Sequence, residues 1–397
     1  MALLIACSIA SLSAPAGAAS WEDEVRSLAG SKGVVYVLSG SGQPLLQLGT
    51  REPFIPASTL KIVTGLLAAE YLGLDSHFET HFWIEPSNAG DLLVVKGFGD
   101  PFLVSEELDR VAEAVKASLP QGQTLAGVAI DDSYFAPDIT IPGVGRSDNP
   151  YDALNSAVAV NFNTVHVQRS KGKITSAEPQ TPLTPLARRV ARQRGVKGKE
   201  RINLSSRPED VRRYAAELIA AKLRGVGVSV GDHFETRRAP GRPARVVHAS
   251  SKSVGDCVGA MLYYSNNYVA NQVFLAIGAQ ERGAPATLAK GVAVANEFLD
   301  RHSELSGIVM TEGSGISYDN RVTGPALAGA LSLFTPYKHL LREKHGSPNK
   351  TGTLKVTKTV AGYLDTREHG TVRYVISLGG GGAARRWKIV DVLRKAL

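Results

Sequence analysis

Three short motifs contain the residue types that acyl transfer requires. The first, Ser58-Thr59-Leu60-Lys61, places a hydroxyl and an amine three residues apart at the start of a helix predicted over 58–72. Residues at i and i+3 lie on one helix face, so the amine can reach the hydroxyl. The helix start also directs unpaired backbone N–H groups and the positive end of the helix dipole toward an anion. The motif therefore predicts Ser58 as a nucleophile and Lys61, kept neutral by burial, as its base.

The second motif, Ser265-Asn266-Asn267, lies between two helical stretches within 253–277. A hydroxyl and a carboxamide two residues apart project the same way from a short turn. We expect Ser265 to relay a proton between Lys61 and the leaving amine. Asn267 is expected to donate a hydrogen bond to the backbone carbonyl of the substrate.

The third motif, Lys350-Thr351-Gly352, opens a strand that continues from Thr353 over 353–364. A cation and a hydroxyl at a strand edge suit an extended peptide with a C-terminal carboxylate, and Gly352 lets the substrate backbone approach closely. The N–H of Thr353 would be the second donor to the oxyanion, beside the N–H of the nucleophile.

Taken alone, each motif also fits an ordinary feature: a solvent-facing helix pair, a polar turn or cap, or an exposed strand start. Their order and spacing together match the S-x-x-K, S-D-N and K-T-G trio of penicillin-binding proteins and class A β-lactamases, with Asn266 in place of Asp.

Beyond this trio, the sequence resembles the low-molecular-mass class C penicillin-binding proteins, the D-alanyl-D-alanine carboxypeptidase/endopeptidases of the penicillin-binding protein 4 type. The likeness extends over nearly the whole chain after the first nineteen residues. It includes GFGDP at 97–101, DDSYF at 131–135, NPYDA at 149–153, VNFN at 160–163 and EGSGIS at 312–317. Two departures are Glu312, where Asp is typical, and Asn271, at a place that is often acidic.

The resemblance implies a penicillin-recognising α/β fold, a five-stranded antiparallel sheet flanked by helices, with an extra domain inserted between the first two motifs. It also implies action on peptidoglycan stem peptides and β-lactams, without a cofactor or metal. The site residues that it implies are acylated Ser58, its base Lys61, the cleft residues Ser265, Asn267 and Lys350, the strand residues Thr351 and Thr353, and Asp152, which would read the amine of the stem peptide's diamino acid.

The order of predicted elements agrees with an insertion. Strands at both ends of the chain and helices between them predict one catalytic domain from 20–75 and 248–397, with a second domain at 76–247. The stretch 171–206 is rich in Pro, Thr and Arg with little periodicity, which predicts irregular structure. His77 and His81 would stand about 13 Å apart on a strand, too far to chelate one ion, so no metal is predicted.

The first nineteen residues are predicted to be a signal peptide, because an apolar run of small residues ends in Ala16-Gly17-Ala18. No later run is apolar enough to span a bilayer. These features predict a secreted protein of the periplasm or cell-wall space. Cys257, in an apolar helical stretch, is predicted to be a buried, inert thiol.

The formal charge of +8 favours anionic surroundings. Seven of the basic residues are Arg188, Arg189, Arg192, Arg194, Lys197, Lys199 and Arg201. No helix-turn-helix, zinc-ligand or RNA signature accompanies them, so the anionic cell wall or a simple solvated face is favoured over nucleic acid. The basic helix predicted over 384–396 is expected to pack on the terminal sheet, with peripheral membrane contact as the alternative.

Two other functions fit the same motifs. A β-lactamase shares the acylation machinery, and a catalytically idle wall-binding protein would share the fold. The complete motifs and the blocks within 76–247 favour the peptidase.

Overall fold

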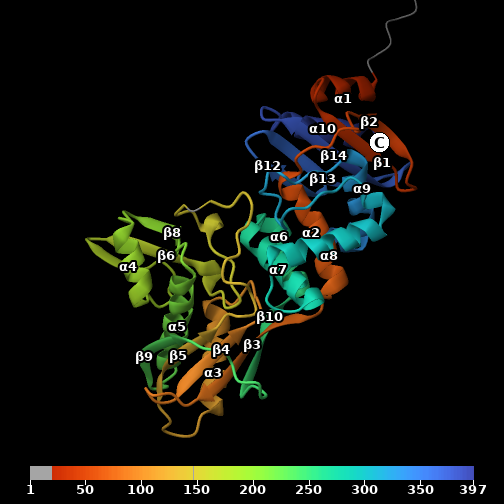
Figure 1. Cartoon of the computed structure of the whole chain (residues 1–397). Helices are drawn as coiled ribbons and strands as arrows, with labels where there is room; N and C mark the ends of the chain where they lie inside the picture. The colour runs from red at the N-terminus through yellow and green to blue at the C-terminus, as the bar shows by residue number, and fades with distance from the viewer. Residues whose placement is uncertain (1–19, 146) are drawn as a thin grey trace, which may run out of the picture.

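The computed structural model describes residues 20–145 and 147–397, so the predicted signal peptide lies outside the described residues. Two lobes are visible, one built from both ends of the chain and one from its middle (Figure 1). In the first lobe the described strands form a six-stranded antiparallel sheet in the order β11-β12-β13-β14-β1-β2. Their bounds are β1 (Val34–Leu38), β2 (Pro44–Leu48), β11 (Arg342–Glu343), β12 (Pro348–Thr353), β13 (Thr357–Thr366) and β14 (Gly370–Gly379).

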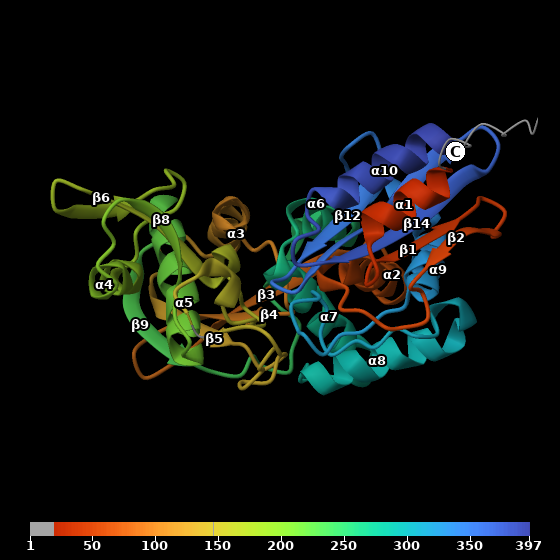
Figure 2. The same ribbon diagram turned by 90° about the horizontal axis from the view of Figure 1, so that it is seen from above.

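Helices cover both faces of this sheet, as Figure 2 shows. On one face lie α1 (Trp21–Ala29) and α10 (Arg385–Ala396); on the other lie α2 (Lys61–Tyr71), α6 (Val254–Tyr264), α7 (Asn267–Arg282), α8 (Leu288–Arg301) and α9 (Gly324–Phe334). The sheet is buried on both sides because β14 and β1 are nearly continuous apolar runs. Ile389 and Val390 of α10 are fully buried against it, which confirms the predicted packing of this helix.

The predicted fold class is confirmed, with one strand boundary wrong. The predicted strand 353–364 is two antiparallel strands, β12 and β13, in which Lys350 lies opposite Ala361. The Lys-Thr-Gly motif therefore lies within a strand that ends at Thr353 and does not open a longer one. The two-residue β11 adds a short sixth strand to the five that the resemblance implies.

The middle lobe contains a five-stranded sheet in the order β10-β3-β4-β5-β9. These strands are β3 (His77–Glu85), β4 (Leu92–Gly97), β5 (Leu125–Asp131), β9 (Val230–Thr236) and β10 (Val246–Ser253), packed against α3 (Ser105–Ser118) and α5 (Pro208–Gly225). The proposed division at 76 and 247 stays a prediction.

The prediction of irregular structure over 171–206 is wrong. This stretch contains β7 (Lys173–Ser176), α4 (Pro185–Gln193) and β8 (Lys199–Asn203), and with β6 (Thr164–Ser170) it forms a small sheet in the order β7-β6-β8. Ile174, Val190 and Ile202 are buried in the core of the middle lobe. Each element buries only a few apolar residues among many charged ones, so its periodicity is weak in the sequence.

Candidate active site

Ser58 lies in a tight turn that is fixed on both sides. A 3-10 turn, η1 (Ala57–Leu60), carries Ser58 directly before α2, and Ala57 holds a left-handed φ of 49°. The hydroxyls of Thr59 and Thr359 both donate to the carbonyl of Pro56, at 2.7 and 2.8 Å. The turn that presents the hydroxyl is therefore fastened to the neighbouring strand β13, and Ser58 remains partly exposed.

The amine of Lys61 is fully buried among three oxygen atoms. Its Nζ lies 2.7 Å from Oδ1 of Asn267, 2.6 Å from the carbonyl of Ser314 and 3.1 Å from Oγ of Ser58. Burial, and then the charge of Lys350, hold the pKa of Lys61 well below its usual range, while Glu312 opposes this shift.

The three contacts of Lys61 fit a neutral amine. A neutral amine has two N–H donors, and the carbonyl of Ser314 and Oδ1 of Asn267 are oxygens that only accept. Its lone pair then faces Oγ of Ser58, the one partner that also carries a proton. The geometry is therefore suited to removing the proton of the Ser58 hydroxyl.

The second motif forms the junction between α6 and α7. Ser265 ends α6 in a left-handed conformation, with φ of 56°, and Asn266 caps α7 by accepting a hydrogen bond from the N–H of Val269. Asn267 is the first residue of α7. Asn266 therefore has a structural role, while Asn267 contacts Lys61 and Ser265 contacts Lys350.

Lys350 connects the third motif to the second. Its Nζ donates to Oγ of Ser265 at 2.8 Å and to the carbonyl of Thr351 at 3.0 Å. Burial, and then the charge of Arg386, lower the pKa of Lys350 to about 7. The structure therefore brings Ser58, Lys61 and Asn267 into one chain of contacts and Ser265 and Lys350 into a second, and the backbone of the motif at 265–267 joins the two.

One edge of β12 is open beside these contacts. Among the described residues, β11 pairs only with Pro348 and Asn349, so the edge from Lys350 to Thr353 has no strand beside it. The predicted reason for Gly352 needs correction, because a Cβ there would stand 2.2 Å from Oγ1 of Thr359 and 2.7 Å from the carbonyl of Pro56. The missing side chain leaves room for the turn that carries Ser58, which lies inside the protein.

Two groups that hold the site were not assigned from the sequence. Arg386 of α10 is buried and donates to the carbonyls of Gly352 and Thr359, each at 3.0 Å, so it ties β12 to β13. The carboxylate of Glu312 accepts from the backbone N–H groups of Ser314 and Gly315, at 2.7 and 2.6 Å, and so fixes the carbonyl that Lys61 contacts.

The two departures from the family pattern contact each other. The side-chain amide of Asn271 donates to Glu312 at 3.0 Å, and its oxygen accepts from the N–H of Gly313 at 2.8 Å. An amide supplies both a donor and an acceptor, whereas a second carboxylate beside Glu312 would add a buried like charge. The pair was visible in the sequence only as two separate substitutions.

Asp152 lies apart from the contacts formed by the two lysines. It is buried in a short turn, η2 (Pro150–Asp152), and its carboxylate accepts from the N–H groups of Gly145 and Ser147, at 2.8 and 3.2 Å. Its role in reading an amine stays a prediction.

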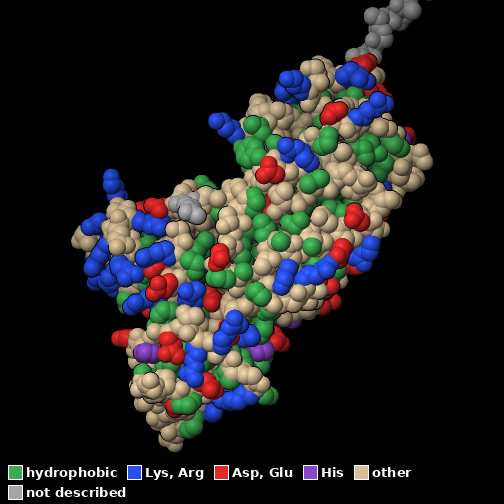
Figure 3. All heavy atoms as spheres, viewed as in Figure 1, with side chains coloured by type: hydrophobic (Ala, Val, Ile, Leu, Met, Phe, Trp, Pro, Cys, Tyr) green, Lys and Arg blue, Asp and Glu red, His purple; other side chains and the backbone are tan. Residues whose placement is uncertain are grey.

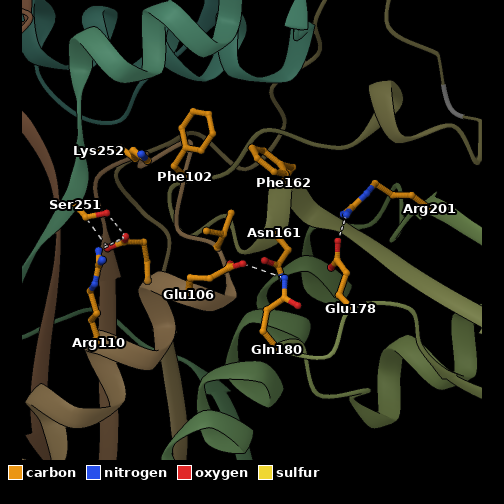
Figure 4. Close-up of a pocket in the computed structure, with 12 residues that line it drawn as sticks. Phe102, Glu106, Arg110, Asn161, Phe162, Glu178, Gln180, Arg201, Ser251 and Lys252 are labelled. Atoms are coloured by element: carbon orange, nitrogen blue, oxygen red, sulfur yellow. Dashed lines mark hydrogen bonds and ion pairs between the residues drawn. The ribbon is translucent and has the colours of Figure 1, made fainter.

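A separate cavity of about 470 Å³ lies in the middle lobe and contains none of the motif residues. Figure 4 shows Phe102 beside Phe162, with Glu106 directed at Gln180 and Arg201 directed at Glu178. Since these polar side chains already have partners, the cavity carries no catalytic assignment. Cys257 is fully buried and burial raises its pKa, as predicted for an inert thiol.

Known proteins are similar to this chain in sequence and in fold. The chain is 26% identical over 344 residues to a D-alanyl-D-alanine carboxypeptidase of Actinomadura, covering 75% of this chain and 63% of that protein. It is 23% identical over 301 residues to a carboxypeptidase of Mycobacterium tuberculosis, covering 73% and 58%. The chain thus spans about three fifths of the length of these two curated relatives.

A solved structure shows the same fold. Penicillin-binding protein 4 of Haemophilus influenzae superposes with a TM-score of 0.74 at 18% identity, covering 94% of this chain and 99% of that one. The sequence model of one family, described as the D-Ala-D-Ala carboxypeptidase 3 (S13) family, matches residues 22–341. Because this match covers most of the chain, the chain belongs to the D-Ala-D-Ala carboxypeptidase 3 (S13) family.

Proposed function

We propose that this chain is a serine-type D-alanyl-D-alanine carboxypeptidase/endopeptidase that acts on peptidoglycan stem peptides through an acyl-enzyme at Ser58. The observation that carries the proposal is the buried Nζ of Lys61, 3.1 Å from Oγ of Ser58 and held by two oxygens that only accept. Family membership supports the reaction class. Inhibition by β-lactams is part of the proposal, since the similar Haemophilus influenzae protein has been solved in complex with a β-lactam.

In the proposed reaction, Lys61 takes the proton of the Ser58 hydroxyl, and Oγ attacks the carbonyl carbon of the penultimate D-alanine. The N–H groups of Ser58 and Thr353 hold the negative charge that develops on the carbonyl oxygen. The C–N bond then breaks, and the proton passes from Lys61 through Ser265 to the departing amine. Water hydrolyses the resulting ester and restores the hydroxyl.

The substrate is proposed to lie along the open edge of β12 as an added strand. Lys350, in its charged form, would bind the terminal carboxylate, with Thr351 on the same side. Asn267 would donate to a backbone carbonyl of the peptide through its amide N–H groups, because its oxygen accepts from Lys61.

Asp152 is proposed to read the amine of the diamino acid. It lines a cavity of about 420 Å³ together with Ile139, Ile141 and Ser206. An incoming ammonium group would share its carboxylate with the donors at Gly145 and Ser147.

The proposed place of action is outside the cytoplasm, in the periplasm or cell-wall space. The family supports this, and residues 1–19 are proposed to be the signal peptide that leads there. In the part of the chain that the structure describes, no helix is long and apolar enough to cross a membrane.

Fluorescent penicillin tests the nucleophile. Wild type should form a covalent adduct that survives denaturation, and Ser58→Ala should lose it entirely because Ser58 carries the hydroxyl that contacts the amine of Lys61. Ser306→Ala, which removes an exposed hydroxyl, is the control and should label normally. Label that persists on Ser58→Ala would contradict the assignment.

The same preparation separates the alternatives. Mass spectra of a pentapeptide and of crosslinked muropeptides should show loss of the terminal D-alanine and cleavage of the crosslink. Rapid turnover of nitrocefin with intact peptides would indicate a β-lactamase. Absence of both reactions, with binding to cell walls retained, would indicate an idle binding protein.

A further inference from the structure

The excess positive charge of the chain is confined to one segment. Residues 164–207 contain eleven Lys and Arg but only two acidic residues, Glu178 and Glu200, a net charge of +9. The rest of the chain contains 34 basic and 35 acidic residues, a net charge of −1. The overall charge of +8 therefore comes from β6, β7, β8, α4 and the loops between them.

Six exposed cations of this segment, here called the basic lobe, are Arg169, Lys171, Lys173, Arg192, Lys197 and Lys199. The sheet brings four of them together, of which Arg169 lies in β6. Lys173 pairs with Ser170 across β6 and β7, Lys199 pairs with Gln168 across β6 and β8, and Lys171 lies in the hairpin turn. Because β6 lies between β7 and β8, Lys173 and Lys199 are separated by two strand spacings, roughly 10 Å. Figure 3 shows Lys and Arg side chains gathered at this end of the molecule.

Across residues 20–145 and 147–397, none of the six side chains of the basic lobe makes an ion pair. The carboxylate of Glu200 in the same segment accepts from the backbone N–H of Lys197 at 3.2 Å. Neighbouring cations of the segment do make ion pairs: Arg189 pairs with Asp210, and Arg201 pairs with Glu178. Like charges gathered on one surface repel one another, so a bound polyanion would relieve this repulsion.

The kind of polyanion follows from what the segment lacks. Residues 164–207 contain no Phe, Tyr or Trp, so there is no platform on which single-stranded nucleic acid could stack its bases. The exposed large apolar residues of the described chain all lie outside this segment, so the lobe has no apolar anchor for a lipid interface. Recognition by charge alone suits a flexible polymer with one anionic group in each repeat unit.

We propose that the basic lobe binds an anionic, phosphodiester-bearing polymer of the cell envelope. Lysine and arginine neutralise phosphate groups along the polymer and release its counterions, which makes binding strong at low salt. The assignment of the polymer to the envelope rests on the proposed function. The binding itself depends only on the charges of the lobe.

Binding to poly(glycerol phosphate) tests the proposal. The affinity of the full chain, measured by titration calorimetry at several salt concentrations, should fall as salt rises. The variant Lys171→Gln/Lys173→Gln/Lys197→Gln/Lys199→Gln should bind at least about tenfold more weakly and should show a smaller dependence on salt, since each phosphate contact adds roughly 0.7–0.9 to the slope.

A matched variant controls for net charge. Lys32→Gln/Lys116→Gln/Lys388→Gln/Lys395→Gln removes four exposed lysines outside the lobe that make no ion pair within the described residues, and it should bind like wild type. Equal weakening of both variants would overturn the proposal, because net charge alone would then explain binding. Tighter binding to oligo(dT) or to phosphatidylglycerol vesicles than to the polymer would also overturn it.

A second readout keeps this test separate from the proposed function. Both variants should be acylated by fluorescent penicillin at the wild-type rate, since no lobe residue contacts Ser58 or Lys61. This also shows that they are folded. If wild type bound the polymer but was not acylated, the proposed function would be contradicted, while the proposed binding of the polymer to the basic lobe would still be supported.

Discussion

The two lysines of the site differ in what each must do with its proton. In the proposed reaction Lys61 must be neutral to accept the proton of Ser58, and burial lowers the pKa of Lys61, which favours that form. Lys350 would have to be charged to bind a carboxylate, yet burial also lowers its pKa, to about 7. Burial thus favours the neutral form that Lys61 would need as a base, and it restricts the charged form of Lys350, which would bind the carboxylate, to pH values below about 7.

We expect kcat/KM for a D-alanyl-D-alanine peptide to fall on both sides of an optimum. As the pH falls through the lowered pKa of Lys61, the amine becomes protonated and acylation slows. As the pH rises above about 7, Lys350 loses its charge and no longer binds the terminal carboxylate of the peptide. The profile of kcat/KM reports these groups in the free enzyme.

An amidated peptide is the control for this profile. Without a terminal carboxylate it should react more slowly below pH 7, and it should lose the decrease above pH 7 while keeping the decrease at low pH. An identical alkaline decrease for both peptides would show that Lys350 does not bind the carboxylate.

The packing of β12 against the turn that carries Ser58 predicts how a single added methyl group should change the rate of acylation. Gly352→Ala should push the turn away from Thr359 and Pro56, and we expect acylation by penicillin to fall by about 100-fold or more, because catalytic geometry is sensitive to shifts of about 1 Å. Stopped-flow labelling measures this rate.

The control for this change is Gly381→Ala. A Cβ at Gly381 would meet nothing within 4 Å, so its rate should stay near that of wild type. If Gly352→Ala also reacted at the wild-type rate, the close contact between β12 and the turn would not be important for catalysis.

The sequence could predict the elements that carry chemistry better than those that support them. The motif residues are recognisable because each reaction step demands a particular side chain, and the order of motifs gives the fold. Arg386 could not be assigned, because a buried guanidinium that holds two carbonyls looks like any basic residue of an amphipathic helix. Its role depends on a strand-to-helix contact that is distant in sequence.

The small sheet of the middle lobe was missed for a similar reason. Its strands are short and largely polar or charged, and each buries one or two apolar residues in the core: Val165, Val167, Ile174 and Ile202. A hydrophobic period needs several repeats to be detected, and each of these strands supplies one or two. The same density of charge that hides the strands forms the basic lobe.

The two lobes are joined through α7, which begins with Asn267. Gln272 of this helix is buried, donates to the carbonyl of Ser156 at 2.6 Å and accepts from Asn155 at 2.8 Å. Gln272→Ala removes both of these hydrogen bonds, although Asn155 keeps its hydrogen bond to the carbonyl of Tyr268, and the change should lower the free energy of unfolding by about 1–3 kcal/mol. Urea denaturation measures this change.

Gln193→Ala, at an exposed position of α4, is the matched control and should change the free energy of unfolding by less than about 0.5 kcal/mol. A similar small effect at Gln272 would mean that this contact between the lobes adds little to stability.

Arg386 fastens β12 from α10, which follows all three motifs in the chain. A ribosome that has already produced Ser58, Lys61 and Lys350 has therefore still to make the guanidinium that holds the carbonyls of Gly352 and Thr359. If the proposed function is right, a product truncated before Arg386 would carry every motif residue and yet should cut the stem peptides of the wall more slowly than the full chain.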